Sequence, residues 1–154
     1  MVLKDVKSDY ENLIGKKEAI LTSSDLHYIP GIESQIRQLF ANLLSNALKF
    51  CGADCRVSIC SDYPALEERM LHTTLDPDKS YLRLIFSDNG IGFEPQYAEK
   101  IFMIFQRLHS PSDYGGTGIG LALCKKIVEN HYGYIAADSK PGSGAAFTVW
   151  LPYQ

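Results

Sequence analysis

The stretch Asp88-Asn89-Gly90-Ile91-Gly92-Phe93 follows a segment, 81–87, whose residue pattern is typical of a β-strand. With a period of two, one face of that strand carries three apolar side chains, Leu82, Leu84 and Phe86. Asp88 continues the same face, so its carboxylate is predicted to point inward at the end of the strand. A carboxylate in such a place is unfavourable unless hydrogen-bond donors meet it.

The two glycines of this stretch, Gly90 and Gly92, remove side chains where the chain turns, so backbone or a ligand can approach closely. An inward acid followed by two glycines predicts a pocket that recognises an amino group on a flat ligand. The alternative is an ordinary Asp-Asn-Gly turn at the end of a strand.

The strongest helical pattern in the chain lies upstream. Apolar residues recur there at helical spacing, at Ile36, Leu39, Phe40, Leu43, Leu44 and Ala47. This stripe predicts a helix with one buried face. At about 100° per residue, Asn42, Asn46 and Lys49 fall within about 60° of one another beside the stripe.

Asparagine is a mediocre residue for a helix interior because its side chain competes for backbone hydrogen bonds. Two of them one turn apart, followed by Lys49, therefore suggest a carboxamide ligand for a metal and a cation for a phosphate. The alternative is that these three residues form the solvated flank of a helix.

A second glycine cluster, Gly116-Thr117-Gly118-Ile119-Gly120, opens a segment with helical spacing that runs to Ile127. Exposed backbone N–H groups at the positive end of a helix dipole are suited to bind phosphate. No Lys-Ser/Thr pair follows, as a P-loop requires, and no strand precedes the cluster, as in a dinucleotide-binding fold. Residues 106–117 lack periodicity and carry glycines, which predicts a mobile loop.

The remaining pattern predicts an uncapped helix over 2–14. Two short β-like pieces follow, 18–21 and 26–29, which could pair as an edge hairpin. A strand is predicted over 55–61. A polar excursion over 62–80 follows, and then, beyond the first glycine stretch, a short helix over 97–105 and a hairpin of 134–137 with 145–151 across a Pro-Gly turn.

The composition is that of a globular protein with one domain. The chain has 154 residues, of which 45% are apolar and 21% charged, and its net charge of −3 argues against a nucleic-acid-binding face. No apolar run approaches the roughly 18 residues of a membrane span, and the first residues do not form a signal peptide. The four cysteines lack the spacing of a zinc site, so we predict reduced thiols.

Four blocks, in this order, resemble the catalytic ATP-binding domain of sensor histidine kinases, within the gyrase, Hsp90, histidine kinase and MutL superfamily. They are 38–50 (the N box), 88–93 (the first glycine box), 101–110 (the F box) and 116–123 (the second glycine box). Residues 142–147 are a looser match to the terminal glycine motif, where the family usually has Thr at the position of Ala145. The resemblance extends over nearly the whole chain, from residue 2 to residue 152.

This resemblance implies an α/β two-layer sandwich, a mixed β-sheet with helices packed on one face, known as the Bergerat fold. It implies that Asp88 accepts a hydrogen bond from the adenine amino group and that Asn46 gives its amide oxygen to Mg²⁺. Asn42 would support the magnesium shell and Lys49 would contact phosphate. Arg107, on an ATP lid over 102–117, would contact the γ-phosphate. The other residues implied to contact ATP are Gly90, Gly92, Phe93, Phe102, Phe105, Thr117, Gly118, Ile119, Gly120 and Leu121.

One position distinguishes the kinases from the ATPases of the superfamily. The ATPases have a general-base Glu one turn before the magnesium Asn, whereas this chain has Asn42, which cannot take a proton. The resemblance therefore implies phosphoryl transfer to a histidine on a separate helical dimerisation domain. None of the four histidines here has the acidic and proline context of such an acceptor.

The uncapped helix over 2–14 is expected to be the junction to that dimerisation domain. We therefore expect a fragment of a longer kinase, cytoplasmic and monomeric as an isolated domain, that serves a response regulator receiver domain downstream. The parent kinase could be anchored in a membrane. The alternatives are a conformational ATPase, an inactive nucleotide-binding module that regulates a partner, and a fold that does not bind nucleotide.

Overall fold

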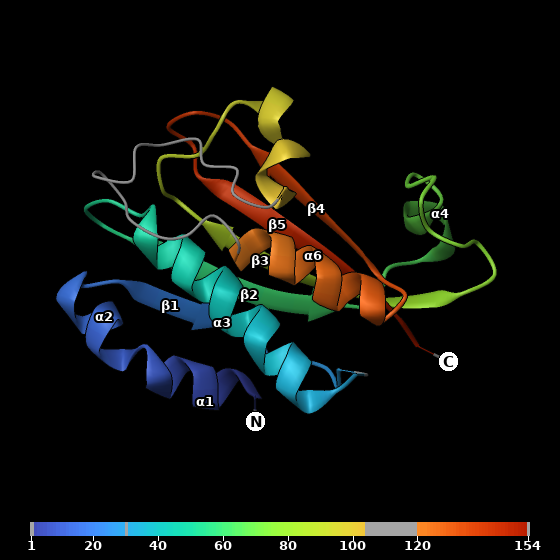
Figure 1. The fold of residues 1–154 in the computed structure, drawn as a ribbon, viewed down its shortest axis with the longest axis horizontal. Helices are drawn as coiled ribbons and strands as arrows, with labels where there is room; N and C mark the ends of the chain where they lie inside the picture. The colour runs from blue at the N-terminus through green and yellow to red at the C-terminus, as the bar shows by residue number, and fades with distance from the viewer. Residues whose placement is uncertain (1, 30, 104–119, 154) are drawn as a thin grey trace.

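The computed structural model describes residues 2–29, 31–103 and 120–153, and Figure 1 shows their arrangement. The helices are α1 (Val2–Asp9), α2 (Glu11–Lys16), α3 (Glu33–Lys49), α4 (Leu66–Arg69) and α6 (Gly120–Asn130), with 3₁₀ turns η1 (Pro95–Tyr97) and η2 (Lys100–Phe102). The strands are β1 (Ile20–Ser23), β2 (Arg56–Asp62), β3 (Ser80–Asp88), β4 (Tyr134–Ser139) and β5 (Ala145–Tyr153).

The five strands form one mixed sheet in the order β1-β2-β3-β5-β4. Among the described strands, β1 and β2 are parallel and the other neighbouring pairs are antiparallel. The helices α1, α3 and α6 lie side by side over one face of this sheet (Figure 1). The predicted α/β sandwich, a mixed sheet with helices on one face, is confirmed.

The core lies between these helices and the sheet. All six residues of the predicted apolar stripe on α3 are buried, and Phe40 meets Phe86 of β3 edge to face at 5.1 Å. On β3 the predicted inward residues Leu82, Leu84 and Phe86 are each 2% exposed or less, so the alternation predicted from the sequence is correct. Val6 of α1 joins the same core.

The other face of the sheet carries a smaller cluster beneath the polar excursion between β2 and β3. Leu75 of the excursion packs with Tyr81 and Trp150, which are buried. Arg83 lies over the Trp150 ring at 5.4 Å and pairs with Asp62 and with Glu68 of α4. The excursion is therefore anchored to the sheet on the side away from the helices.

Three predicted elements differ from the structure. The helix expected over 2–14 divides at Tyr10 into α1 and α2. The edge hairpin of 18–21 with 26–29 is wrong, because β1 pairs with β2 and His27 instead bonds through its N–H to the Ser61 hydroxyl at 3.0 Å. In place of one helix over 97–105 the described part forms η1 and η2, and residues 104 and 105 lie outside the described residues.

The prediction of reduced thiols is wrong for two of the four cysteines. Cys51 and Cys55 face each other across a tight turn after α3, with Cα atoms 5.3 Å apart, and form a disulfide. Cys60 is free and exposed, and Cys124 is free and buried. Burial raises the pKa of the Cys124 thiol to about 12, so this group stays protonated.

Among the described residues, no helix combines the length and apolar character that crossing a membrane requires.

Candidate functional site

Asp88 ends β3 on the face that the helices cover, in the position predicted from the alternation. Its Oδ1 accepts a hydrogen bond from the Gly90 N–H at 2.8 Å, and the Ala145 N–H also bonds to the carboxylate. Burial raises the pKa of Asp88 above its ordinary value, and the two backbone donors offset part of that shift. The carboxylate is thus partly desolvated and held by backbone groups.

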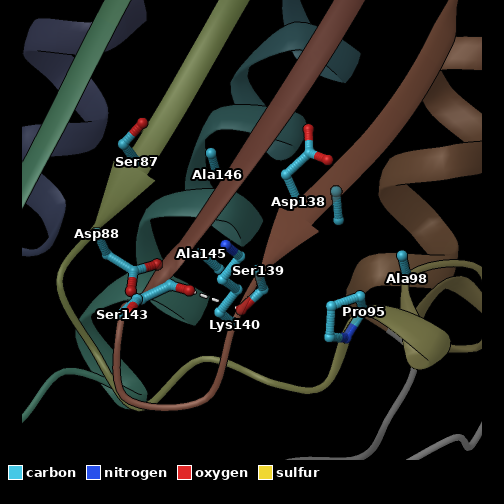
Figure 2. Close-up of a pocket in the computed structure, with 12 residues that line it drawn as sticks. Ser87, Asp88, Pro95, Ala98, Asp138, Ser139, Lys140, Ser143, Ala145 and Ala146 are labelled. Atoms are coloured by element: carbon cyan, nitrogen blue, oxygen red, sulfur yellow. Dashed lines mark hydrogen bonds between the residues drawn. The ribbon is translucent and has the colours of Figure 1, made fainter.

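The Asp88 side chain lines a cavity of about 510 Å³ at the end of the sheet (Figure 2). Its walls come from the last residues of β3, from the β4–β5 hairpin and, through Pro95 and Ala98, from the η1 segment. Figure 2 shows Asp88 and Ser139 on neighbouring parts of this wall. A cavity with an anionic acceptor in its wall is able to receive a ligand that presents an amino group.

The glycine stretch after Asp88 packs directly on the end of α3. Ile91 donates its N–H to the Phe50 carbonyl at 3.0 Å. A Cβ at Gly90 would lie 2.4 Å from that same carbonyl oxygen, so only glycine allows this approach. The lack of a side chain at Gly90 therefore allows the two backbones to contact each other.

The glycine stretch also interlocks with the turn between β4 and β5. Gly92 has a positive φ of 66°, and a Cβ there would lie 2.2 Å from the Lys140 carbonyl oxygen. The Ile91 carbonyl accepts a hydrogen bond from the Gly142 N–H at 2.7 Å. The Ser139 hydroxyl accepts from the Phe93 N–H at 2.8 Å and donates to the Gly144 carbonyl at 2.6 Å.

The polar flank of α3 contains the three residues predicted to serve phosphate and metal. Asn42 accepts a hydrogen bond from Gln38 at 2.9 Å and donates one to the Gly120 carbonyl at 3.3 Å, so it links α3 to the start of α6. The main-chain carbonyl of Asn46 accepts a hydrogen bond from the Phe50 N–H at 3.2 Å. Lys49 ends the helix, with Nζ 5.4 Å from the centre of the Phe50 ring.

Asn46 and Lys49 therefore stand in the last turn of α3, next to Phe50, whose carbonyl holds the first glycine stretch. The hydrogen bond from the Ile91 N–H to the Phe50 carbonyl joins this helix end to the glycine stretch that begins at Asp88. Asn46 has an amide oxygen, which is the kind of ligand that Mg²⁺ prefers. The described residues contain no group of three or more His, Cys, Asp or Glu side chains that could hold a metal.

The other predicted contact residues fall into two groups. Phe93 and Leu121 are partly buried against the core, Phe102 is buried edge to face with Phe147 at 6.2 Å, and Gly120 begins α6. The second group lies outside the described residues, and it comprises Phe105, Arg107, Thr117, Gly118 and Ile119. The predicted mobile loop and lid fall largely within that same part of the chain.

Three contributors to this site were missed by the sequence analysis. The Asn89 amide accepts from the Arg56 N–H at 2.7 Å and donates to the Asp54 carbonyl at 2.8 Å, which ties the glycine stretch to the disulfide turn. The other two are the Phe50 carbonyl and the Ser139 hydroxyl. Asn89 belongs to the Asp88–Phe93 stretch, and its side-chain amide indicates a possible hydrogen-bonding role. The Phe50 carbonyl and the Ser139 hydroxyl carry no such signal, because their contacts depend on how strands and turns pair.

Residues 31–154 match the family described as histidine kinase-, DNA gyrase B- and HSP90-like ATPases. The chain belongs to this family. Within the family, it is 39% identical over 140 residues to cyanobacterial phytochrome A of Nostoc sp., an alignment that covers 90% of this chain and 16% of the relative. It is 31% identical over 152 residues to the adaptive-response sensory kinase SasA of Crocosphaera subtropica, covering 97% of this chain and 36% of that kinase.

Solved structures of this ATPase family share the fold. The catalytic domain of histidine kinase ThkA superposes with a TM-score of 0.74 at 23% identity, over 98% of this chain and 91% of that domain. Full-length ShkA in complex with AMPPNP gives 0.74 at 22% identity over 98% and 29% of the two chains. ThkA in complex with the response regulator TrrA gives 0.68 at 20% identity over 99% and 40%. The chain thus spans a minor part of the full-length kinases and the relatives it matches.

Proposed function

We propose that this chain binds Mg-ATP and donates the γ-phosphoryl group to a histidine on a separate helical dimerisation domain, as part of two-component signal transduction. The observation that carries the proposal is the position of Asp88. Its carboxylate is partly desolvated, held by two backbone donors and set in the wall of a cavity, and the glycine stretch that follows it is bonded to the Phe50 carbonyl at the end of α3. An adenine amino group would be a suitable donor to it.

The phosphates would extend from Asp88 toward the last turn of α3 and the start of α6. Asn46 would hold Mg²⁺ by its amide oxygen, and Lys49 would contact phosphate as a cation. Bound Mg²⁺ would neutralise charge on the phosphates and orient them for transfer. Gly118 and Gly120 would present backbone amides near the N-terminus of α6, and Arg107 would reach the γ-phosphate.

The environment of Asn42 supports a kinase rather than an ATPase. Its amide is engaged on both sides, with Gln38 and with the Gly120 carbonyl, and an amide cannot remove a proton from water. The residue would therefore position α3 and α6 around the phosphates. The chain would hold ATP intact until an acceptor histidine is supplied, and catalysis would rest on positioning.

The solved neighbours are consistent with this assignment. The full-length ShkA structure contains AMPPNP, and ThkA was crystallised with a response regulator. We extend both properties to this chain as proposals, namely ATP as ligand and a receiver domain as the downstream partner. The dimerisation domain would belong to the same parent kinase, which could be membrane-anchored with this domain in the cytoplasm, and the isolated chain would be monomeric.

Isothermal calorimetry of the chain with ATP and with GTP, each with and without Mg²⁺, tests the binding. We expect binding that favours ATP over GTP and that strengthens with Mg²⁺. Equal affinity for ATP and GTP would contradict the role of Asp88, and an affinity independent of Mg²⁺ would contradict the role of Asn46.

A steady-state phosphate-release assay on the same sample tests the kinase assignment. We expect little turnover by the chain alone, and transfer of label from γ-³²P-ATP to a histidine when a phosphoacceptor domain is added. Robust hydrolysis without that domain would favour the conformational ATPase. ATP binding without transfer to any acceptor histidine would favour the regulatory module.

A further inference from the structure

Residues 89–93, directly after β3, have no regular secondary structure, so the shape of this glycine stretch depends on hydrogen bonds made to other segments. On the side of the β4–β5 turn, the only side chain that bonds to this stretch within the described residues is Ser139. It is the last residue of β4, and it lies in register with Ala145 of β5, which in turn lies beside Asp88 of β3. These three residues form one row across the end of the sheet.

The Ser139 hydroxyl bridges two backbone segments. It accepts from the Phe93 N–H at 2.8 Å and donates to the Gly144 carbonyl at 2.6 Å. Its one donor is thereby used and its oxygen already accepts a bond. This hydroxyl, in a residue that also lines the cavity, therefore joins the glycine stretch to the turn.

The two bridged segments also touch Asp88 and its neighbours directly. A Cβ at Gly144 would lie 1.9 Å from the Asp88 carbonyl oxygen, and a Cβ at Gly92 would lie 2.9 Å from the Ser139 hydroxyl. Backbone contacts this close leave little room for the two segments to shift independently. A change in the bridge would therefore be transmitted to the backbone that carries the Asp88 carboxylate.

We propose that Ser139 is a positioning residue for adenine recognition, an inference that rests on the proposed ATP-binding function. By joining the Phe93 amide to the Gly144 carbonyl, it fixes the distance between the glycine stretch and the β4–β5 turn. It thereby sets the direction of the Asp88 carboxylate toward the base. Ser139 acts on binding through the Asp88 backbone and not through a hydrogen bond of its own to the base.

The main test compares Ser139→Ala with the matched control Ser58→Ala. Ser58 is an exposed serine of β2 that neither lines the cavity nor takes part in the bridge. Calorimetry at a temperature where all variants show native near-UV circular dichroism gives the affinity for Mg-ATP. Titration with Mg-tripolyphosphate, followed by NMR, measures the phosphate end of the site without adenine.

We expect Ser139→Ala to weaken Mg-ATP binding about tenfold, the effect of losing roughly one to two ordinary hydrogen bonds, with tripolyphosphate affinity unchanged. Ser139→Thr, which keeps the hydroxyl, should restore much of the loss, and Ser58→Ala should bind as the unmodified chain does. Equal loss for ATP and tripolyphosphate, or no loss for either, would overturn the positioning role.

Hydrogen exchange in the unmodified chain provides a test that does not depend on the variants folding. The Phe93 amide should exchange slowly because the Ser139 hydroxyl accepts its hydrogen bond, and exchange at the rate of an open loop amide would overturn the bridge. Failure of the unmodified chain to bind ATP would instead reject the proposed function and with it this inference. Normal ATP binding by both the unmodified chain and Ser139→Ala would reject the inference alone.

Discussion

Asp88 combines two opposing demands at one residue. A carboxylate that receives an adenine amino group has to be ionised, yet burial makes the ionised form less favourable and raises the pKa. The Gly90 and Ala145 amides offset part of this cost. The residue is therefore expected to favour binding while lowering the stability of the empty domain.

Asp88→Asn tests whether the Asp88 carboxylate contributes to ATP binding. The substituted amide presents an N–H₂ group or a weaker acceptor to the base, so one partner of a buried hydrogen bond is lost. We expect ATP binding to weaken by about 1–3 kcal/mol, measured by calorimetry. Asp138→Asn is the matched control, because Asp138 lines the same cavity from the opposite face of the sheet. Comparable losses in the two variants would remove Asp88 from the base-binding position.

The same Asp88→Asn variant tests whether the buried Asp88 carboxylate lowers the stability of the empty domain, through the pH dependence of unfolding. Because the pKa of Asp88 is raised on folding, the folded chain holds this proton more tightly, and stability is lost as the pH rises through the folded-state pKa. Asp88→Asn removes that loss. Without nucleotide, we expect the variant to unfold at higher urea concentration than the unmodified chain at pH 7. The difference should shrink as the pH falls toward 4, and a variant less stable at pH 7 would contradict the expectation.

At the scale of elements, His131 at the C-terminal end of α6 joins this helix to the start of α3. Its Nδ1 donates to the Ile127 carbonyl at 2.7 Å, so Nε2 is the acceptor for the Ile32 N–H at 2.9 Å. Ile32 is the N-cap residue of α3, and its own side chain makes no capping hydrogen bond. The two helices that carry the predicted phosphate contacts are thus fixed to each other at the end remote from the glycine stretch.

His131→Ala should lower the free energy of unfolding by about 0.5–2 kcal/mol, the usual effect of losing a helix cap. Urea denaturation followed by circular dichroism measures it. Glu129→Ala in the same helix is the control, since Glu129 is exposed, and it should change stability by less than about 0.5 kcal/mol. Equal stability of His131→Ala and the unmodified chain would show that the α3 cap is replaced by solvent without cost.

The excursion between β2 and β3 depends on Arg83, which joins Asp62 and Glu68 and covers Trp150. Trp150 is the single tryptophan of the chain, so its fluorescence reports on this cluster alone. We expect Arg83→Ala to shift Trp150 emission to the red, because loss of the ion pairs exposes the ring, with ATP affinity unchanged. Arg56→Ala is the control, since its ion pair with Asp54 is exposed, and an unshifted spectrum of Arg83→Ala would show that the excursion is held by Leu75 and Tyr81 instead.

At the scale of the whole molecule, local pattern and spacing were enough to predict most of the elements. The stripe on α3 and the alternation up to Asp88 were predicted correctly because a half-buried helix or strand repeats with its own period. The parallel pairing of β1 with β2 was not predicted, because nothing in the 18–29 segment specifies a partner more than thirty residues away. The Cys51–Cys55 disulfide was missed for a related reason, since the turn that brings the two residues together exists only once α3 has ended.

In the candidate site, too, some residues could be chosen from the sequence and others could not. Asp88, Asn42, Asn46 and Lys49 could be chosen as candidates because their residue types are unusual for the places that the pattern gives them. The Ser139 bridge could not be found, because its two partners are backbone groups that come near only when β4 pairs with β5 and the glycine stretch packs on their turn. Glycines indicate that a close backbone contact is possible, but the residue type does not say which N–H and which carbonyl will meet.

Val6 tests whether α1 belongs to the folded unit or only leads into it. This residue is 1% exposed, and it lies in the same continuous core as α3 and the inner face of the sheet. Val6→Ala removes two buried methyl groups, and we expect the free energy of unfolding to fall by about 1–3 kcal/mol. The control is Lys4→Ala on the exposed side of the same helix.

Two probes decide whether the effect is global. Circular dichroism follows the helices, and Trp150 fluorescence follows the opposite face of the sheet, so a cooperative domain should show the same lower urea midpoint with both in Val6→Ala. A midpoint that falls in circular dichroism alone would mean that α1 unfolds separately. In that case a partner domain attached at α1 could move without straining the nucleotide site, whereas a shared transition means that α1 can transmit strain from such a partner into α3.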